Sequence, residues 1–221
     1  MKRITAAATI AAPVLFLVVN LIHPKEYTRD HESQQLQTIA EHYTRWQIAH
    51  FLTLIAILIF VVVVVGFAWI LYRRLEAMAL VGGLLGLWGL VCLGAVLALD
   101  GFTWGALGQV TTWPSASRHT LELALHAVQQ SHWNLQYYVG GLSWIFGLLI
   151  LSIGLIRQGL IPAVWGWIFA LGVLLVGIEG AVQNNTYFIV AAAVLAVGGV
   201  GVGVALVNDD ESAAGRDLQA G

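Results

Sequence analysis

The side chains best suited to chemistry in this chain are three histidines and a glutamate in the stretch HTLELALHAVQQSHW, residues 119–133. Imidazole nitrogens and carboxylates bind zinc, copper or iron, and histidine also titrates near neutral pH. On a helix, His119, Glu122 and His126 fall near one face because they are three and four residues apart. His132 follows His126 by six residues and points about 120° away, so these two need a bend in the helix to share one ion.

The wider candidate set gathers histidines and carboxylates from several segments. A site for a ligand or a metal would draw on His50, Asp100, Glu122, His126, His132 and Glu179. Within this set, the expected ligands of a transition metal or a haem are His50, His126 and His132, together with Asp100 or Glu179. The alternative is that these side chains are simply solvated among lipid headgroups. The chain contains no HExxH motif and no pair of cysteines, which are common signs of a metal site.

The elements that position these residues are membrane-spanning helices. Only 10% of the 221 residues are charged and the mean hydropathy is +0.82. A helix needs about 20 apolar residues to cross about 30 Å of hydrocarbon, and the alternating pattern of a transmembrane barrel is missing from the sequence. We therefore predict an all-α, polytopic membrane bundle with six transmembrane helices, at residues 4–22, 47–72, 77–99, 133–156, 161–182 and 186–207.

The six predicted spans form a single membrane domain over residues 1–207, and the small, polar and acidic residues 208–221 predict a disordered cytoplasmic tail. The first span is expected to be retained, because its apolar run is longer than the core of a signal peptide. Two GxxxG pairs, Gly82 with Gly86 and Gly199 with Gly203, predict close helix packing. The sole cysteine, Cys92, is expected to be a small packing residue.

Basic residues in the loops predict the orientation of the bundle. An even number of spans places both termini on one side, and that side carries more Lys and Arg than the other. By the positive-inside rule it is cytoplasmic, so we predict a multi-pass plasma membrane protein with both termini in the cytoplasm. The predicted inside residues are Lys2, Arg3, Arg73, Arg74, Arg157 and Arg216, and the outside residues are Lys25, Arg29, Arg45 and Arg118.

With this orientation, all seven histidines lie outside the membrane or at its outer boundary, and the inner halves of the spans are almost entirely apolar. Channels and transporters normally carry polar groups at the midplane, so the sequence argues against conduction and predicts an outward-facing polar cup. Two segments are expected to cover it. Residues 31–46 carry an apolar helical stripe, and residues 101–132 include a helix capped by Ser115 or Ser117.

Three short stretches resemble a known group of proteins: HP after the first span, WQIAHFLTLIAILIF at the start of the second, and LALDGF at the end of the third. The chain is similar to the six-helix prokaryotic integral membrane proteins that are classed as domains of unknown function. This resemblance covers most of the chain and implies no activity. Zinc-dependent membrane hydrolases of the ceramidase type also gather His and Asp at one membrane face, but their Ser-x3-His and His-x3-His patterns are missing here.

The leading hypothesis is a non-enzymatic membrane protein whose outer cup binds a small ligand or a partner protein. One alternative is a redox protein or a metal-dependent membrane enzyme with a metal or haem at the outer face. A second is a structural subunit that docks on another membrane protein through GFTWGALGQVTTWP, residues 101–114. The bilayer is the expected surrounding, and nucleic acid is excluded as a partner because the sequence has no phosphate loop or basic patch.

Overall fold

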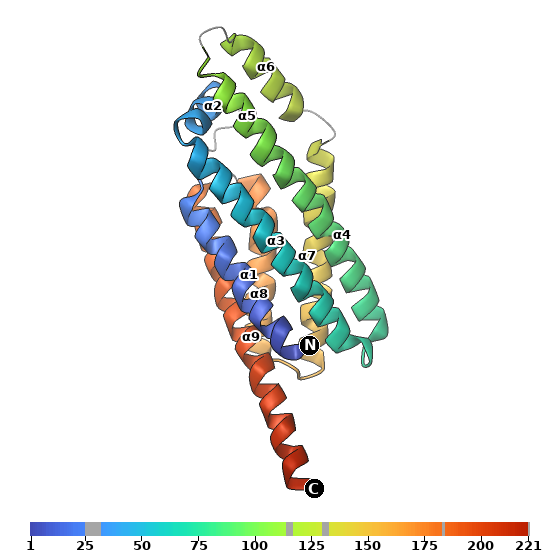
Figure 1. The fold of residues 1–221 in the computed structure, drawn as a ribbon. Helices are drawn as coiled ribbons and strands as arrows, with labels where there is room; N and C mark the ends of the chain where they lie inside the picture. Colours follow the sequence, from blue (N-terminus) through green and yellow to red (C-terminus); the bar gives the residue numbers. More distant parts are fainter. Residues whose placement is uncertain (25–31, 114–116, 130–132, 183, 221) are drawn as a thin grey trace.

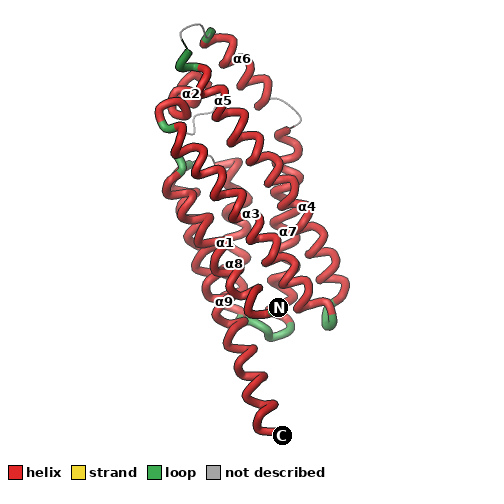
Figure 2. Tube along the Cα trace, viewed as in Figure 1, coloured by secondary structure: helices red, strands yellow, loops and turns green. Residues whose placement is uncertain are grey.

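The structure is a computed structural model that describes residues 1–24, 32–113, 117–129, 133–182 and 184–220. Within these ranges the chain is helical and has no strand, which confirms the all-α prediction (Figure 2). The helices of the membrane bundle are α1 (Lys2–Ile22), α3 (Tyr43–Tyr72), α4 (Glu76–Leu99), α7 (Trp133–Arg157), α8 (Ala163–Val182) and α9 (Asn185–Ala220).

Each predicted span corresponds to one helix of this bundle. Five helical stretches among the described residues are long and apolar enough to cross a membrane, namely Lys2–Ile22, Tyr43–Tyr72, Glu76–Val110, Tyr138–Arg157 and Asn185–Asp209. The sixth, in α8, has a shorter described apolar stretch, Ala163–Ile178. The chain is therefore a multi-pass membrane protein by the length and composition of its helices.

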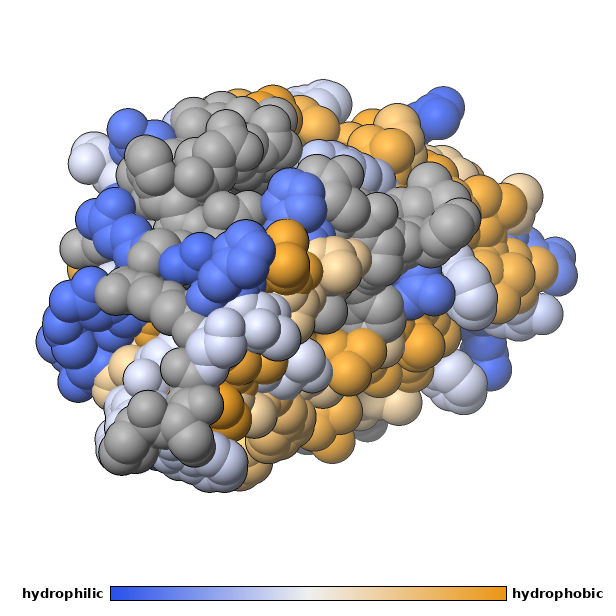
Figure 3. Space-filling view, turned by 90° about the horizontal axis from the view of Figure 1, so that it is seen from above, coloured by the Kyte–Doolittle hydropathy of each residue, from blue (hydrophilic) through white to orange (hydrophobic). Residues whose placement is uncertain are grey.

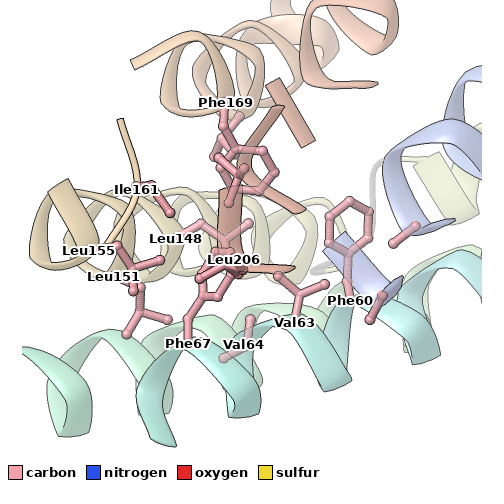
Figure 4. Close-up of a cluster of buried hydrophobic side chains, with 14 of the residues drawn as sticks. Phe60, Val63, Val64, Phe67, Leu148, Leu151, Leu155, Ile161, Phe169 and Leu206 are labelled. Atoms are coloured by element: carbon pink, nitrogen blue, oxygen red, sulfur yellow. The ribbon is translucent and has the colours of Figure 1, made fainter. Parts of the chain in front are cut away.

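The bundle helices pack in a closed ring, in the order α1, α3, α4, α7, α8, α9 and back to α1, with α3 also touching α7 (Figure 1). Aromatic rings fill the interior of this ring. Phe60 packs edge-on against Trp144, with ring centroids 5.6 Å apart. Phe67 packs in the same way against Phe169 at 6.1 Å (Figure 4). The surrounding side chains are aliphatic and buried. This apolar filling agrees with the prediction that the bundle is sealed below its polar end.

Glycines let the helices of the ring approach each other closely. A Cβ atom on Gly147 of α7 would lie 2.6 Å from the Cα atom of Gly86 in α4. On α9, a Cβ atom on Gly199 would lie 2.6 Å from the carbonyl oxygen of Thr9, which Pro13 cannot bond because proline has no N–H. Both predicted GxxxG pairs therefore lie at contacts between helices of the same chain, as expected for small residues that let membrane helices approach closely.

Four short elements close one end of the bundle, which we call the capped end: α2 (Glu32–Glu41), the π-helix η1 (Asp100–Trp104), α5 (Gly105–Val110) and α6 (Arg118–Gln129) (Figure 1). Thr120 N–H donates to Ser117 Oγ at 3.3 Å, which confirms Ser117 as the cap of α6. The other predicted cap, Ser115, lies outside the described residues. Viewed onto this end, hydrophilic residues gather there while hydrophobic residues cover the flank (Figure 3).

One helix carries the chain from the membrane into the cap. The sequence places the end of the third span at Asp100, but α4 continues through η1 into α5, giving an unbroken helical stretch Glu76–Val110 of 35 residues. At 1.5 Å per residue this stretch is about 50 Å long, against about 30 Å of hydrocarbon. Its last turns therefore extend beyond the bilayer and support α2.

The opposite end of the bundle, the terminal end, contains the start of α1 and the last turns of α9 (Figure 1). Lys2 Nζ lies 2.7 Å from Asp209 Oδ2, so an ion pair joins the two helices there. Helix α9 continues to Ala220, through the residues for which the sequence predicts a disordered tail, and that disorder stays a prediction. The side of the membrane on which this end lies also stays a prediction.

Candidate functional site

Five of the six predicted site residues are distributed over two elements of the capped end and two helices of the ring. His50 is in the second turn of α3, Asp100 begins η1, and Glu122 and His126 are on α6. Glu122 is half-buried and His126 is exposed. Glu179 is in α8, but its side chain lies outside the described structure, and so does the whole of His132.

The structure does not gather the predicted metal ligands into one cluster among the residues it describes. Within that part of the chain, no group of three or more His, Cys, Asp or Glu side chains is placed to hold a metal ion. The proposed set of His50, His126 and His132 includes a residue outside the description, so the set itself stays a prediction. His50 is the candidate around which a dense arrangement of side chains does form.

Two side chains of α3 meet the same glycine of η1. Trp46 and His50 are four residues apart and lie on one face of α3, as their spacing in WQIAH predicts. Trp46 Nε1–H donates to the carbonyl oxygen of Gly101 at 3.2 Å. A Cβ atom on Gly101 would lie 2.7 Å from His50 Cβ, so the ring of His50 occupies the space that any larger residue would need. The stretches WQIAH and LALDGF, far apart in the sequence, are therefore in direct contact.

The π-helix η1 shapes this contact from the other side. A π-turn contains one more residue than an α-turn and is often found at functional sites, because it changes the direction in which side chains and carbonyls point. Here the turn spans Asp100–Trp104 and presents the carbonyl of Gly101 to α3. Asp100, at the start of the turn, is half-buried. The helix does not end at Asp100 but continues through η1 into α5.

The hydrogen bond of His50 determines which ring nitrogen is left for a ligand. Nδ1 lies 2.9 Å from the carbonyl oxygen of Trp46, and a carbonyl only accepts, so Nδ1 carries the hydrogen. In the neutral ring, Nε2 is then the nitrogen with the lone pair. No other hydrogen bond of His50 is formed among the described residues. The side chain is 7% exposed, so any ligand of Nε2 would be held away from bulk water.

Three more rings complete the arrangement, which we call the His50 junction: His23, Trp46, His50, Gly101 and Trp104. The ring centroids of His23 and His50 are 4.9 Å apart, and those of Trp46 and His50 are 4.3 Å apart. Trp104 stacks on Trp46 with a centroid distance of 6.2 Å, and its buried Nε1–H makes no hydrogen bond within the described structure. The junction thus offers a nitrogen acceptor, an N–H donor and flat apolar surfaces.

Helix α2 and the start of α3 cover the outer side of η1 and α5. Leu36 and Ile39 of α2 are 1% and 0% exposed, as their predicted apolar stripe requires. Ile39 packs where Gly108 has no side chain, and the rings of Tyr43 and Trp46 lie over Gly105. The predicted helix over residues 31–46 is interrupted at His42, between α2 and α3. Arg45 Nε donates to the carbonyl of Ile22 at the end of α1, which holds α1 against the cap.

A separate groove of about 500 Å³ lies at the terminal end, between α8 and α9. Trp165 and several valines and alanines of α9 line it, with Asn208 as its main polar group. It lies at the opposite end of the bundle from His50, and none of the described residues that line it is a histidine or a carboxylate, so it is separate from the candidate site.

Sequence reasoning missed three members of the His50 junction. His23 was counted among the outer histidines but not among the ligands, and Gly101 and Trp104 were only part of a covering segment. The useful signal was the spacing of Gly101, Gly105 and Gly108, three glycines that fall near one helical face after LALD. Glycines in such a row indicate that another element approaches closely, here α2 and α3.

Comparison with known proteins gives one match. A family model described as "Domain of unknown function (DUF4386)" matches residues 4–207, from the first turn of α1 through the membrane part of α9. No curated protein and no solved structure matches the chain. The match therefore includes both the membrane bundle and the capped end.

Proposed function

The chain belongs to the DUF4386 family, whose description assigns no activity, and from its own geometry we propose that its capped end binds a small ligand through the ring of His50. The observation that supports this proposal is the fixed orientation of the imidazole. Because Nδ1 donates to the backbone of Trp46, Nε2 is presented as an acceptor or a metal ligand inside a mostly apolar junction.

The composition of the junction limits the ligand. Trp46, Trp104 and His23 provide ring surfaces on which a flat or apolar group packs, and Trp104 Nε1–H provides a donor. A ligand with a hydrogen-bond donor for His50 and an acceptor for Trp104 would use both groups. No Ser-His or Cys-His pair is placed beside His50 among the described residues, and we therefore propose binding in preference to catalysis.

A transition metal or haem is the second candidate ligand, and one distance favours it. Two imidazoles that bind one ion through nitrogens at about 2.0–2.1 Å place their ring centres roughly 5 Å apart when the bond angle is near tetrahedral. His23 and His50 lie 4.9 Å apart by this measure. Further ligands would come from Asp100, Glu122, His126, His132 or Glu179.

The proposal places the capped end outside the cell. The exposed Arg73 and Arg74 follow α3, and the exposed Arg157 ends α7, all at the terminal end, where the positive-inside rule expects cytoplasmic basic residues. Labelling of single cysteines in the loop at residues 73–75, in intact cells, tests this orientation. Reaction with a reagent that does not cross the membrane would overturn it.

Two substitutions of His50 separate its structural bond from its ligand atom. In His50→Asn, the amide N–H takes the place of Nδ1–H and keeps the bond to Trp46, but nothing replaces Nε2. In His50→Gln, the longer amide reaches the position of Nε2 and loses the donor at Nδ1. An exposed histidine of α6 gives the control, His119→Asn.

The experiment measures what copurifies with the protein. Each variant is extracted from native membranes in mild detergent and analysed by elemental mass spectrometry, small-molecule mass spectrometry and visible absorption. We expect a near-stoichiometric metal, haem or organic molecule in the wild type and in His119→Asn, a loss of at least about tenfold in His50→Asn, and partial retention in His50→Gln. A wild-type protein that carries nothing beyond the content of His50→Asn would contradict the proposal.

A further inference from the structure

We infer that residues 32–46 form an arm that closes the His50 junction, and that the contact between Ile39 and Gly108 is the latch that controls how often the arm opens. The inference deepens the proposed function and rests on it for the identity of the ligand, but its geometry stands by itself. The arm consists of α2 and the first turn of α3; it runs along η1 and α5, and α6 also touches α2.

The arm and the helix beneath it meet at three successive glycines. His50 lies against Gly101, Tyr43 and Trp46 lie over Gly105, and Ile39 lies against Gly108. The order of these contacts is antiparallel, so α2 is the outer tip and His50 is the innermost point. An arm that detaches from its tip therefore frees Ile39 first, then Trp46 from the carbonyl of Gly101, and only then uncovers His50.

The tip is attached by few apolar side chains. In α2, Leu36 and Ile39 are buried, while Gln34, Gln37 and Glu41 are exposed. Elements with few buried apolar contacts open more readily than a packed core. The apolar anchors of α2 are thus strong enough to keep it closed most of the time and few enough to release it without unfolding the bundle.

The latch has a specific shape. A Cβ atom on Gly108 would lie 2.9 Å from Ile39 Cβ, so glycine leaves a notch that the isoleucine fills. His42 separates the tip from α3, with φ −120° and ψ 30°, outside helical geometry. This break allows α2 to leave first, and His50 is uncovered only when the opening continues into the first turn of α3 and separates Trp46 from Gly101. Arg45, in the first turn of α3, donates a hydrogen bond to the carbonyl of Ile22 at the end of α1. This part of the arm is therefore attached to α1 as well as to η1 and α5.

Chemical modification of His50 by diethyl pyrocarbonate, which reacts with accessible imidazole nitrogens, measures the opening. The protein is placed in lipid nanodiscs at constant pH, and the modification rate of each histidine is followed by mass spectrometry. His119 and His126 are exposed on α6, so their modification rates give the reference for solvent-exposed histidines. The buried thiol of Cys92, in the wall between α4 and α7, reports opening of the whole bundle through its reaction with a maleimide.

We expect Ile39→Ala and Gly108→Ala each to raise the modification rate of His50 by at least about tenfold, because one empties the notch and the other fills it. Gln37→Ala, at an exposed position of α2, should leave the rate unchanged. A disulfide between Ile39→Cys and Gly108→Cys should lower the rate at least about tenfold, and reduction should restore it. A small separation of the two helices brings their Cβ atoms into disulfide range.

Two results would overturn the inference. The first is an unchanged His50 rate in Ile39→Ala and Gly108→Ala, which would mean that the arm does not control access. The second is a parallel rise in the Cys92 rate, which would mean that the whole bundle opens. Neither readout needs a bound ligand, so a protein that copurifies with nothing would defeat the proposed function and leave this test of the arm intact.

Discussion

Glycines pack both the wall between α4 and α7 and the His50 junction, but they do so against different partners. In the wall, Gly147 approaches the backbone of Gly86, so two main chains are in contact. At the junction, Gly101 receives the side chain of His50, and further along the capped end Gly108 receives that of Ile39. A main chain in a helix cannot move aside, whereas a side chain or a short helix can. The comparison indicates a rigid membrane wall and a capped end that is able to rearrange.

The largest expected effect is in the wall. In Gly147→Ala, the new methyl group would overlap the backbone of Gly86, and neither helix can relieve the overlap without leaving its other contacts. We expect the free energy of unfolding in detergent to fall by about 3 kcal/mol or more, the upper range for overpacking. Thermal unfolding followed by circular dichroism measures it.

The matched control for this change is Gly141→Ala in the same helix, where a Cβ atom would have nothing within 4 Å. It should be neutral or slightly stabilising, since alanine favours a helix over glycine by about 1 kcal/mol in soluble peptides. Equal destabilisation by both substitutions would show that α7 does not tolerate an added methyl group at either position. The close approach of Gly147 to Gly86 would then not explain the loss of stability.

The next effect is at the junction. Gly101→Ala would push the ring of His50 away and lengthen the bond from Trp46, at an expected cost of about 1–3 kcal/mol. Hydrogen exchange should speed up at residues 43–50 and 100–108 while the core helices stay protected. Gly94→Ala, whose Cβ would make an ordinary contact of 3.7 Å with Ile57, is the control. Loss of protection throughout the bundle would argue against a separable capped end.

A smaller effect is expected when only the Trp46 hydrogen bond is removed. Trp46→Phe keeps an aromatic ring at this position but loses the N–H that donates to Gly101, which should cost about 1 kcal/mol. Trp69→Phe, at a position that is 65% exposed on the flank, is the comparison. If both variants unfold at the same temperature as the wild type, the bond to the π-turn does not stabilise the cap.

The smallest effect is expected at the terminal end. Lys2 and Asp209 are about one-third exposed, and ion pairs of this kind contribute at most about 1 kcal/mol. Lys2→Met should lower the thermal midpoint only slightly, and added salt should reduce the difference between the variant and the wild type. A large, salt-independent loss of stability would mean that this pair joins α1 to α9 more strongly than its exposure indicates.

Most of the fold follows from the sequence, because the periodicity and length of apolar runs determine where membrane helices form. The runs at residues 4–22 and 47–72 correspond closely to α1 and α3. The apolar stripe through Leu36 and Ile39 is buried as its spacing requires. The sequence did not predict that the helix continues beyond Asp100, because it does so through a π-turn that packs against α3 and leaves no clear local signature.

The candidate site was only partly predictable. The spacing of Trp46 and His50 places them on one face of α3, which the sequence shows directly. Their contact with Gly101 depends on the register between α3 and η1, and register between distant segments is decided by shape complementarity and not by residue type. The metal set of His50, His126 and His132 requires that α6 and α3 bring their histidines together, and it stays a prediction. The neighbour that the sequence did not single out for His50 is His23.

The orientation of the His50 ring, with the hydrogen on Nδ1 and Nε2 turned toward a ligand, underlies the proposed function. Nuclear magnetic resonance of protein labelled with [15N]histidine, in lipid nanodiscs and with His50→Asn used for assignment, measures this directly because protonated and unprotonated ring nitrogens give distinct signals. We expect a protonated Nδ1 and an Nε2 signal that changes when the copurified ligand is extracted. A His50 ring with its hydrogen on Nε2 and none on Nδ1 would rule out ligand binding through Nε2.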